Sequence, residues 1–381
     1  MEGFGDSYFT SKTIEKMITT IDKYIIKKYL GTLGFMLLLL SIIVVVIDVQ
    51  SKSPRIESNG FTVGYFLVNF YPFWMIYLII TFMSILVFIS VIFFTSRMAN
   101  NTEIVAIISS GASFHRFARP YFIASGLIAV FSLTTNHFLL PWANTEKNKL
   151  EAYTMGEASR EKILGNTEIA TQLSPTSYIF INNYNRKEKR GSSMLLQNFD
   201  KKRKLVHQIS ANEIFWEEKK QKFTITGYLE RHIGKDGKEK LSNGEKKDLD
   251  LGHPPQELFP DELLGQTKTT PELLALIQQE KQKGNSNLNF FLNELYLRTS
   301  MPVSIIILTI LALSLSSQKK RGGIGGNLAI GIALAFVFVF SFEALKVVSQ
   351  NNVIPPLLAM WIPNLVFGPL AAILYFKRAN Q

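Results

Sequence analysis

Few residues of this chain have the types and spacings that could carry out chemistry. The 381 residues include no cysteine, which excludes disulfides and thiol catalysis. They also lack the phosphate-loop motif GxxxxGK[ST], the zinc-protease motif HExxH and the nucleophile motif GxSxG. The glycine-rich GGIGG at 322–326 follows no strand pattern, and each of the five histidines is more typical of a surface or packing residue than of a ligand. We therefore predict no catalytic residue, no metal and no cofactor bound by the chain itself.

Charged residues beside apolar stretches are the remaining candidates, because ionisable groups near a membrane are costly and often mark a substrate path. Arg298 lies near one end of such a stretch, and Glu343 with Lys346 lies near the end of another. All three could instead extend to the membrane surface. At a spacing of i, i+3, Glu343 and Lys346 could form a local ion pair, or they could line the path of an amphiphilic substrate.

Six apolar runs must position these residues, and each is long enough to cross a bilayer. They cover 30–47, 66–94, 121–140, 295–315, 328–348 and 354–376. The sequence thus predicts an α-helical membrane protein with six spans in a 3+3 arrangement. The first run has no cleavage site after it, so we expect it to be retained as an anchor.

The distribution of lysine and arginine predicts the orientation of the spans. Basic residues gather at 12–28, 97–119, 319–321 and 377–378, whereas only Lys52 and Arg55 occupy the short connections on the other side. The positive-inside rule therefore places the N-terminus in the cytoplasm and the segment between spans three and four outside. The net charge of +11 resides mainly in the membrane part, where it indicates orientation, and we expect no nucleic-acid partner.

Between the two sets of spans, hydropathy falls and residues alternate with period 2, which is typical of antiparallel strands. The clearest alternation occurs at 177–184, 204–209 and 222–233. A charged segment at 234–255 is predicted to be a flexible hairpin or loop. The expected organisation is 1–141 with the first three spans, 142–293 as a β domain, and 294–381 with the last three spans.

A short amphipathic stretch lies between the second and third spans. Asn100 and Asn101 are candidate caps for a helix with Glu103 in its first turn. Ile104, Ile107 and Ile108 fall on one helical face, and Gly111 ends the pattern. Pro120 is expected to start the next helix. We predict that helix 101–111 docks on a partner.

Five segments, in this order and around a β insert of this size, resemble the lipopolysaccharide export permease family (LptF/LptG). They are IDKYIIKKYLGT, NTEIVAIISSGASFHRFARP, NHFLLPWAN, ELYLRTSMP and PPLLAMWIPN. The resemblance implies a six-span subunit of an ABC transporter in the bacterial inner membrane, with a periplasmic β-jellyroll. It further implies a homologous permease partner (in a heterodimer, or a homodimer if no second copy exists), a cytoplasmic ATPase dimer that binds ATP, and a periplasmic bridge protein of β-jellyroll type that receives lipopolysaccharide.

The resemblance also suggests roles for particular residues. The docking stretch becomes the coupling helix, so that Glu103, Ile104, Ile107, Ile108 and Gly111 would contact the ATPase. Lys52 and Arg55 correspond to a basic cluster that meets the phosphates of lipid A, and Arg298 and Lys346 are the next candidates for that contact. Which of the two permeases the chain resembles stays open.

Two other classes of function remain as alternatives. A membrane scaffold or sensor would use its spans only to anchor a β domain that binds a periplasmic partner, although six spans exceed what an anchor needs. An intramembrane hydrolase would need paired catalytic groups within the membrane, and the sequence offers none. Copurification of an ATPase would separate a transporter from a scaffold.

Overall fold

The computed structural model describes residues 19–154, 166–185, 188–200, 202–234, 237–252, 254–255, 264–283, 288–318 and 323–380. The chain divides into two compact units, each considered by itself. The membrane unit comprises Met1–Ile47, Met75–Leu140 and Tyr296–Gln381, and the β unit comprises Asp48–Trp74 and Pro141–Leu295.

Six helical segments among the described residues are long and apolar enough to cross a membrane, as the sequence predicts. They are α2 (Thr20–Ser58), α4 (Tyr71–Asn100), the continuous segment Phe114–Glu151, α12 (Leu288–Ser316), α13 (Gly323–Gln350) and α14 (Pro356–Ala379). The segment Phe114–Glu151 combines α6 (Phe114–Thr134), a π-helical turn η1 (Thr135–Leu139) and α7 (Leu140–Glu151). The chain is therefore a multi-pass membrane protein.

Two helix boundaries differ from the predictions. The expected second span splits at Phe70, where α3 (Val63–Asn69) ends before α4 begins. The next helix begins at Phe114 and not at Pro120, because the Ser113 side chain accepts a hydrogen bond from the Arg116 amide and caps it. Pro120 is buried inside α6.

Aromatic stacking and polar contacts hold the core of the membrane unit together. The Tyr29 ring stacks on Phe94 at 5.5 Å between centroids, and Phe94 stacks on Tyr121 at 5.4 Å. The Tyr29 hydroxyl lies 3.0 Å from that of Thr309 in α12, so this stack joins helices from both halves of the sequence. Such interhelical hydrogen bonds are an effective way to link helices where water is absent.

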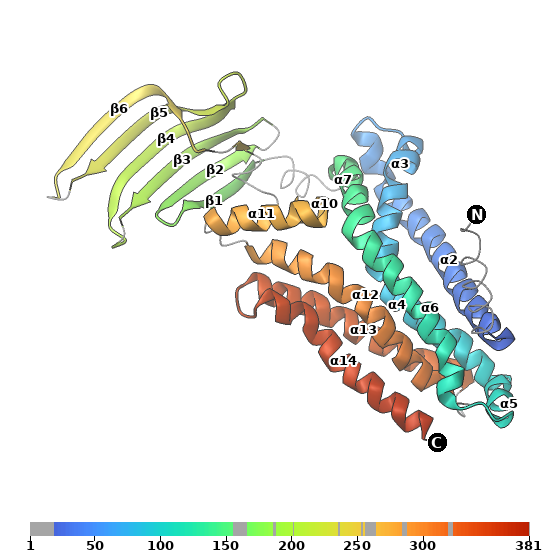
Figure 1. Ribbon diagram of the computed structural model, residues 1–381. Helices are drawn as coiled ribbons and strands as arrows, with labels where there is room; N and C mark the ends of the chain where they lie inside the picture. The colour runs from blue at the N-terminus through green and yellow to red at the C-terminus, as the bar shows by residue number, and fades with distance from the viewer. Residues whose placement is uncertain are drawn as a thin grey trace, which may run out of the picture. The chain divides into compact units, whose positions relative to one another are not determined.

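The β unit contains an open antiparallel sheet, with its strands in sequence order among the described residues (Figure 1). The strands are β1 (Asn166–Ser174), β2 (Ser177–Asn185), β3 (Arg190–Phe199), β4 (Leu205–Glu217), β5 (Lys222–Ile233) and β6 (Glu239–Leu249). This sheet is consistent with the predicted jellyroll-like domain, and the alternation at 177–184, 204–209 and 222–233 falls on β2, β4 and β5. Among the described residues, the β unit also contains the short helices η2 (Ala152–Thr154), α10 (Leu264–Thr267) and α11 (Thr270–Lys283).

The charged segment 234–255 is an ordered strand over much of its length. β6 pairs with β5 from Ile233 opposite Glu239 to Phe223 opposite Leu249. The prediction of a hairpin is confirmed, whereas the alternative of a flexible loop is wrong for Glu239–Leu249; residues 235, 236 and 253 lie outside the described part. The sequence did not predict this strand, because its residues are mostly charged and polar. β6 lies at the edge of the sheet, where lysine side chains prevent pairing with another chain.

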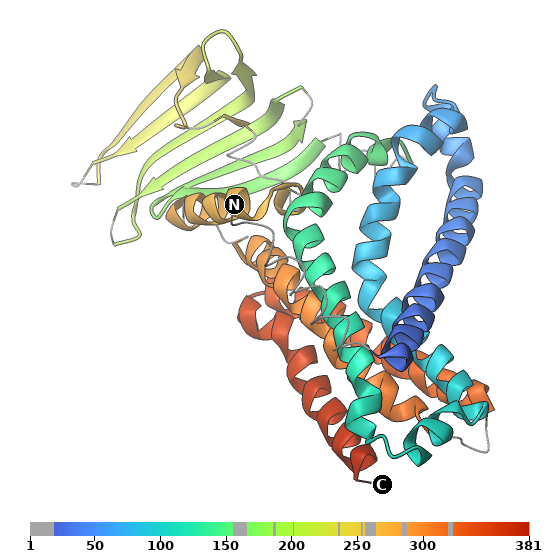
Figure 2. The ribbon, with the colours of Figure 1, turned by 45° about the vertical axis from the view of Figure 1, so that its right-hand side comes forward.

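Halfway along β5, the residues that face the apolar core change from odd-numbered to even-numbered positions. Phe223 and Ile225 are buried in the apolar core, and beyond Gly227, at φ +57°, Tyr228 packs against the same core. The pairing of β4 with β5 keeps the same register on both sides of Gly227, and the buried residues of β4 change parity at the same place, from Ala211 to Ile214. Both strands therefore turn together at Gly227, whose left-handed conformation favours glycine. Residues 230 and 232 follow Tyr228 on the inward face, because they pair with Ile209, which is buried, and with His207, two residues before it. Figure 2 shows the curvature of the sheet.

Candidate functional site

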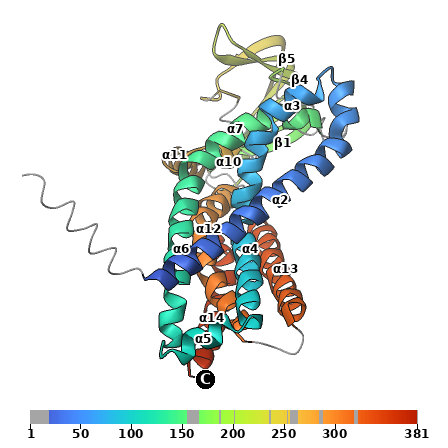
Figure 3. The same ribbon diagram turned by 90° about the vertical axis from the view of Figure 1, so that its right-hand side faces the viewer.

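The predicted docking helix exists as α5 (Glu103–Ser109), shorter than the expected 101–111. Its N-cap is Thr102, at φ 61°, and the Asn101 side chain contacts Glu103 where a cap was expected. Gly111, at φ 92°, lies just beyond its end, in a left-handed conformation that favours glycine. Figure 3 shows α5 and the C-terminus at one end of the membrane unit.

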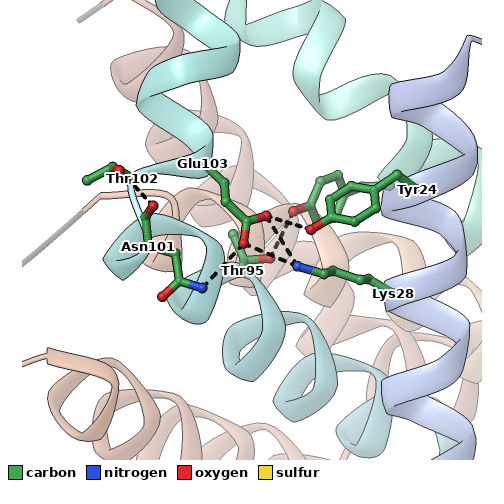
Figure 4. Close-up of polar contacts among 7 residues, drawn as sticks. Tyr24, Lys28, Thr95, Asn101, Thr102 and Glu103 are labelled. Carbon is green, nitrogen blue, oxygen red and sulfur yellow. Dashed lines mark hydrogen bonds and ion pairs between the residues drawn. The ribbon is translucent and has the colours of Figure 1, made fainter.

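The carboxylate of Glu103 joins α5 to α2 (Figure 4). The Tyr24 hydroxyl donates to it at 2.8 Å, the Lys28 ammonium lies 3.2 Å away, and the Asn101 amide donates at 3.3 Å. Burial alone would raise the pKa of Glu103, but the hydrogen bonds from Tyr24, Lys28 and Asn101 outweigh burial and lower it. Glu103 is thus an ionised anchor for α5.

A second ionic contact lies beside this anchor. The Arg116 guanidinium at the start of α6 donates to both carboxylate oxygens of Asp22, each at 2.7 Å, and to the Thr19 hydroxyl at 2.9 Å. The Asp22 side chain is 1% exposed, whereas that of Arg116 is 33% exposed. This bidentate pair fixes the start of α2 against α6, a strong geometry for an arginine and a carboxylate.

The structure changes which side of α5 is available to a partner. Ile104 is 1% exposed and belongs to the core of the membrane unit, and Ile107 and Ile108 pack against that core. Val105 is 58% exposed. Ala106, Ser109, Ser110 and Gly111 are also exposed. The isoleucine face predicted for docking therefore stabilises the chain itself, and the helix presents Val105 and small residues.

Lys52 and Arg55, the predicted lipid-binding pair, have different surroundings within the β unit. The Lys52 ammonium lies 2.9 Å from Asp48 and 5.3 Å from the centre of the Trp74 ring. Arg55 is exposed. Because Lys52 is neutralised by its neighbour, Arg55 is the more available cation of the two.

The other predicted lipid contacts lie in the membrane unit. Arg298 is 2% exposed, so its guanidinium lies in the protein interior and does not extend to the membrane surface. Lys346 is half-buried and Glu343 is exposed on α13. Direct contact of Arg298 or Lys346 with lipid stays a prediction.

An apolar groove lies between α2 and α4, in the part of the membrane unit where Figure 2 draws them as neighbours. Its volume is about 320 Å³. It is lined by Leu37, Leu40, Ser41, Val44, Met75, Leu78, Ile79, Phe82, Ile85 and Leu86. Apart from the Ser41 hydroxyl, these side chains are aliphatic, aromatic or thioether groups.

Sequence reasoning missed the partners of Glu103 and Arg116. Tyr24, Lys28 and Asp22 lie about 75 to 94 residues away along the chain and have no pattern that pairs them. One available signal was Asp22 itself, an acidic residue among lysines just before an apolar run.

Six apolar helices among the described residues, with an antiparallel sheet inserted in the chain between the third and the fourth and a short helix between the second and the third, define a multi-pass membrane protein. The chain belongs to the family of lipopolysaccharide export system permeases LptF/LptG, whose sequence profile matches residues 23–377. This family consists of transporter components, not enzymes. In a comparison with curated proteins, no match to the chain is found.

Proposed function

We propose that this chain is a permease subunit of an ABC transporter that extracts lipopolysaccharide from the bacterial inner membrane and passes it to a periplasmic bridge. The observation that carries the proposal is the family match over residues 23–377, which includes all six spans and the sheet. The apolar groove between α2 and α4 supports it, because acyl chains require such a surface. ATP would be bound by a separate subunit.

The proposed orientation places α5 in the cytoplasm and the sheet in the periplasm. Arg97, Arg116 and Arg119 flank α5, and Lys377 and Arg378 end α14, so all five would be on the cytoplasmic side. The chain has no cysteine, so single cysteines at Ser109 and Ser242 can test this. An impermeant thiol reagent should label Ser242→Cys, and not Ser109→Cys, in intact spheroplasts. Equal labelling of both variants would refute the orientation.

A homologous permease partner would cover α2 and α13. Only 6% of the most apolar stretch of α2 and 22% of that of α13 are buried within the chain, against 56% for α12. Leu38 and Phe336 are examples, with exposed fractions of 60% and 70%. Helices that are apolar and unpacked within one chain suit contact with a second permease and with lipid in the cavity between the two.

The ATPase would dock on the exposed side of α5. Val105→Asp places a charge in that contact without disturbing the core, since the side chain is 58% exposed. We expect the ATPase to be lost on purification while the permease keeps its melting temperature. Leu241→Asp is the matched control, because Leu241 is 61% exposed on β6 and lies outside α5.

Ile104→Val serves as the second control. It shortens a core side chain at a cost of about 0.5–1.5 kcal/mol and should lower the melting temperature while the ATPase remains bound. Wild-type copurification of the ATPase with Val105→Asp would refute docking through this side of α5. If no ATPase copurified even with the wild-type chain, the scaffold alternative would replace the transporter.

A further inference from the structure

Three side chains on the inward face of the sheet, one from β4 and two from β5, lie close together. His207 is two residues from the buried Ile209 on β4, and it pairs directly with His232 on β5. Glu230 precedes His232 by two residues, so strand alternation places both on one face. Glu230 pairs with the buried Ile209, so this is the face that carries the apolar core.

The geometry of the cluster brings three potential ligand atoms together. The Oε1 atom of Glu230 lies 2.8 Å from Nε2 of His207 and 3.3 Å from Nε2 of His232. One ligand atom from each residue lies within 4.8 Å of the other two. The two imidazole rings stack with centroids 4.1 Å apart. Two ligands bound tetrahedrally at about 2.0–2.1 Å from zinc are themselves separated by about 3.3 Å, close to these spacings.

We propose that His207, Glu230 and His232 bind a divalent transition-metal ion of the zinc class, with water in the remaining position. Two imidazoles and one carboxylate form a donor set that zinc accepts, and a position left to water is typical of open zinc sites. Because the two rings are stacked, His232 must tilt so that its lone pair points at the ion. It is 55% exposed and has room to do so.

The two carboxylate oxygens of Glu230 have different partners. The Lys247 ammonium lies 2.6 Å from Oε2 of Glu230, which leaves Oε1 directed to the histidines. The same ammonium repels a bound cation, so it should weaken the site without removing it.

Asn198 holds the ring of His207 from behind. Its Nδ2 lies 3.1 Å from Nδ1 of His207, and its Oδ1 accepts from the Ser177 hydroxyl at 2.6 Å. If the amide turns over, its oxygen accepts from Nδ1–H and its NH₂ donates to Ser177, which leaves Nε2 of His207 free for the metal. Such a partner behind a metal-bound histidine fixes the tautomer and the ring orientation.

The competing explanation is a surface polar cluster that binds no metal, in which His207 and Lys247 share the carboxylate of Glu230. Measuring metal binding distinguishes these two explanations, because removal of Lys247 should weaken a polar cluster but strengthen a cation site. The prediction made from sequence assigned no metal, since it treated the histidines as scattered; the cross-strand pairing of His207 with His232 is what brings them together.

The test uses the full-length chain in detergent with an affinity tag that contains no histidine. Zn²⁺ is titrated by calorimetry, and Co²⁺ is titrated by its visible absorption. We expect one equivalent to bind the wild-type chain, with affinity reduced about tenfold or more in His207→Ala, Glu230→Gln and His232→Gln. Glu213→Gln, at a carboxylate on β4 that is 47% exposed, is the matched control and should bind as the wild type does.

Two further variants test the surroundings of the site. Asn198→Ala should lower affinity by about 10–100-fold if it orients His207, and Lys247→Met should raise affinity. Zn²⁺ should also raise the unfolding temperature of the wild-type sheet and leave that of His232→Gln unchanged. Absence of binding to the wild-type chain, or equal affinity in the wild type and His232→Gln, would overturn the proposal. Because binding is measured without transport or ATPase, neither result bears on the proposed function.

Discussion

Loss of Arg116 should destabilise the membrane unit more than loss of its ion-pair partner Asp22. The Asp22 side chain is 1% exposed in the pair, and in Arg116→Met its charge would keep, among the described residues, the hydrogen bonds from the Thr19 amide at 2.8 Å and the Thr19 hydroxyl at 3.1 Å. Removing one member of a buried pair costs about 3–5 kcal/mol because a charge is left unpaired in the interior. Asp22→Asn leaves a guanidinium that is 33% exposed and can turn to water, so its cost should be about 1–2 kcal/mol.

The double variant Asp22→Asn with Arg116→Met provides the internal control. It removes both charges, so its cost should be close to that of Asp22→Asn alone, about 1–2 kcal/mol, and not the sum of the two single variants. The loss of stability should therefore be largest in Arg116→Met, and smaller and about equal in the double variant and Asp22→Asn. This order follows from the difference in burial of the two partners.

Hydrogen exchange of the first turns of α2 is the appropriate assay, because these turns can open without unfolding the rest of the membrane unit. Protection there should fall most in Arg116→Met, and midpoints in a detergent-denaturant titration should follow the same order. Equal loss of protection in the two single variants, or a double variant as damaged as Arg116→Met, would refute the reasoning from burial.

Three further predictions concern separate parts of the chain. The pKa of Glu103 is lower in the folded state, so the stabilisation of α5 by this carboxylate is fully present above the unfolded pKa of about 4.3 and is lost as the pH falls through the folded value. Hydrogen exchange of α5 should show this loss, and Glu103→Gln should remove the pH dependence. Gly191→Ala should destabilise the sheet by about 1–3 kcal/mol in circular-dichroism melts, since its Cβ would lie 2.4 Å from Cγ2 of Ile181. Arg55→Glu should reduce photo-crosslinking to lipopolysaccharide more than Lys52→Glu, because Lys52 is already paired with Asp48.

The parts of the fold that follow from local patterns could be predicted from the sequence. Apolar runs predicted six spans because length and hydropathy alone decide whether a helix can cross a bilayer. Alternation predicted β5 at its observed bounds, Lys222–Ile233. β6 was harder, because an edge strand with polar side chains on both faces has no alternation to detect.

The candidate site could be predicted only in part, for a physical reason. An amphipathic pattern such as that of Ile104, Ile107 and Ile108 shows that a helix has an apolar face, but not whether that face packs on its own chain or on a partner. Here it packs on its own chain. Pairs such as Glu103 with Tyr24 depend on tertiary contacts between distant segments, and no local pattern encodes them.

The location of Glu103 has a consequence for how an ATPase on α5 would act on lipid, if the proposed function holds. Glu103 connects α5 to Tyr24 and Lys28 on α2, and about three turns further along the same helix Leu37 and Leu40 line the apolar groove. A helix is stiff over that length, so displacement of α5 would move α2 against α4 and change the width of the groove. Coupling of this kind needs a continuous rigid element between the two sites, and α2 provides one. The contacts of Glu103 with Tyr24 and Lys28 are the weakest part of this connection, because they are partly exposed and water can compete for them. A variant that weakens these contacts should therefore uncouple ATP hydrolysis from lipid movement while the ATPase stays bound.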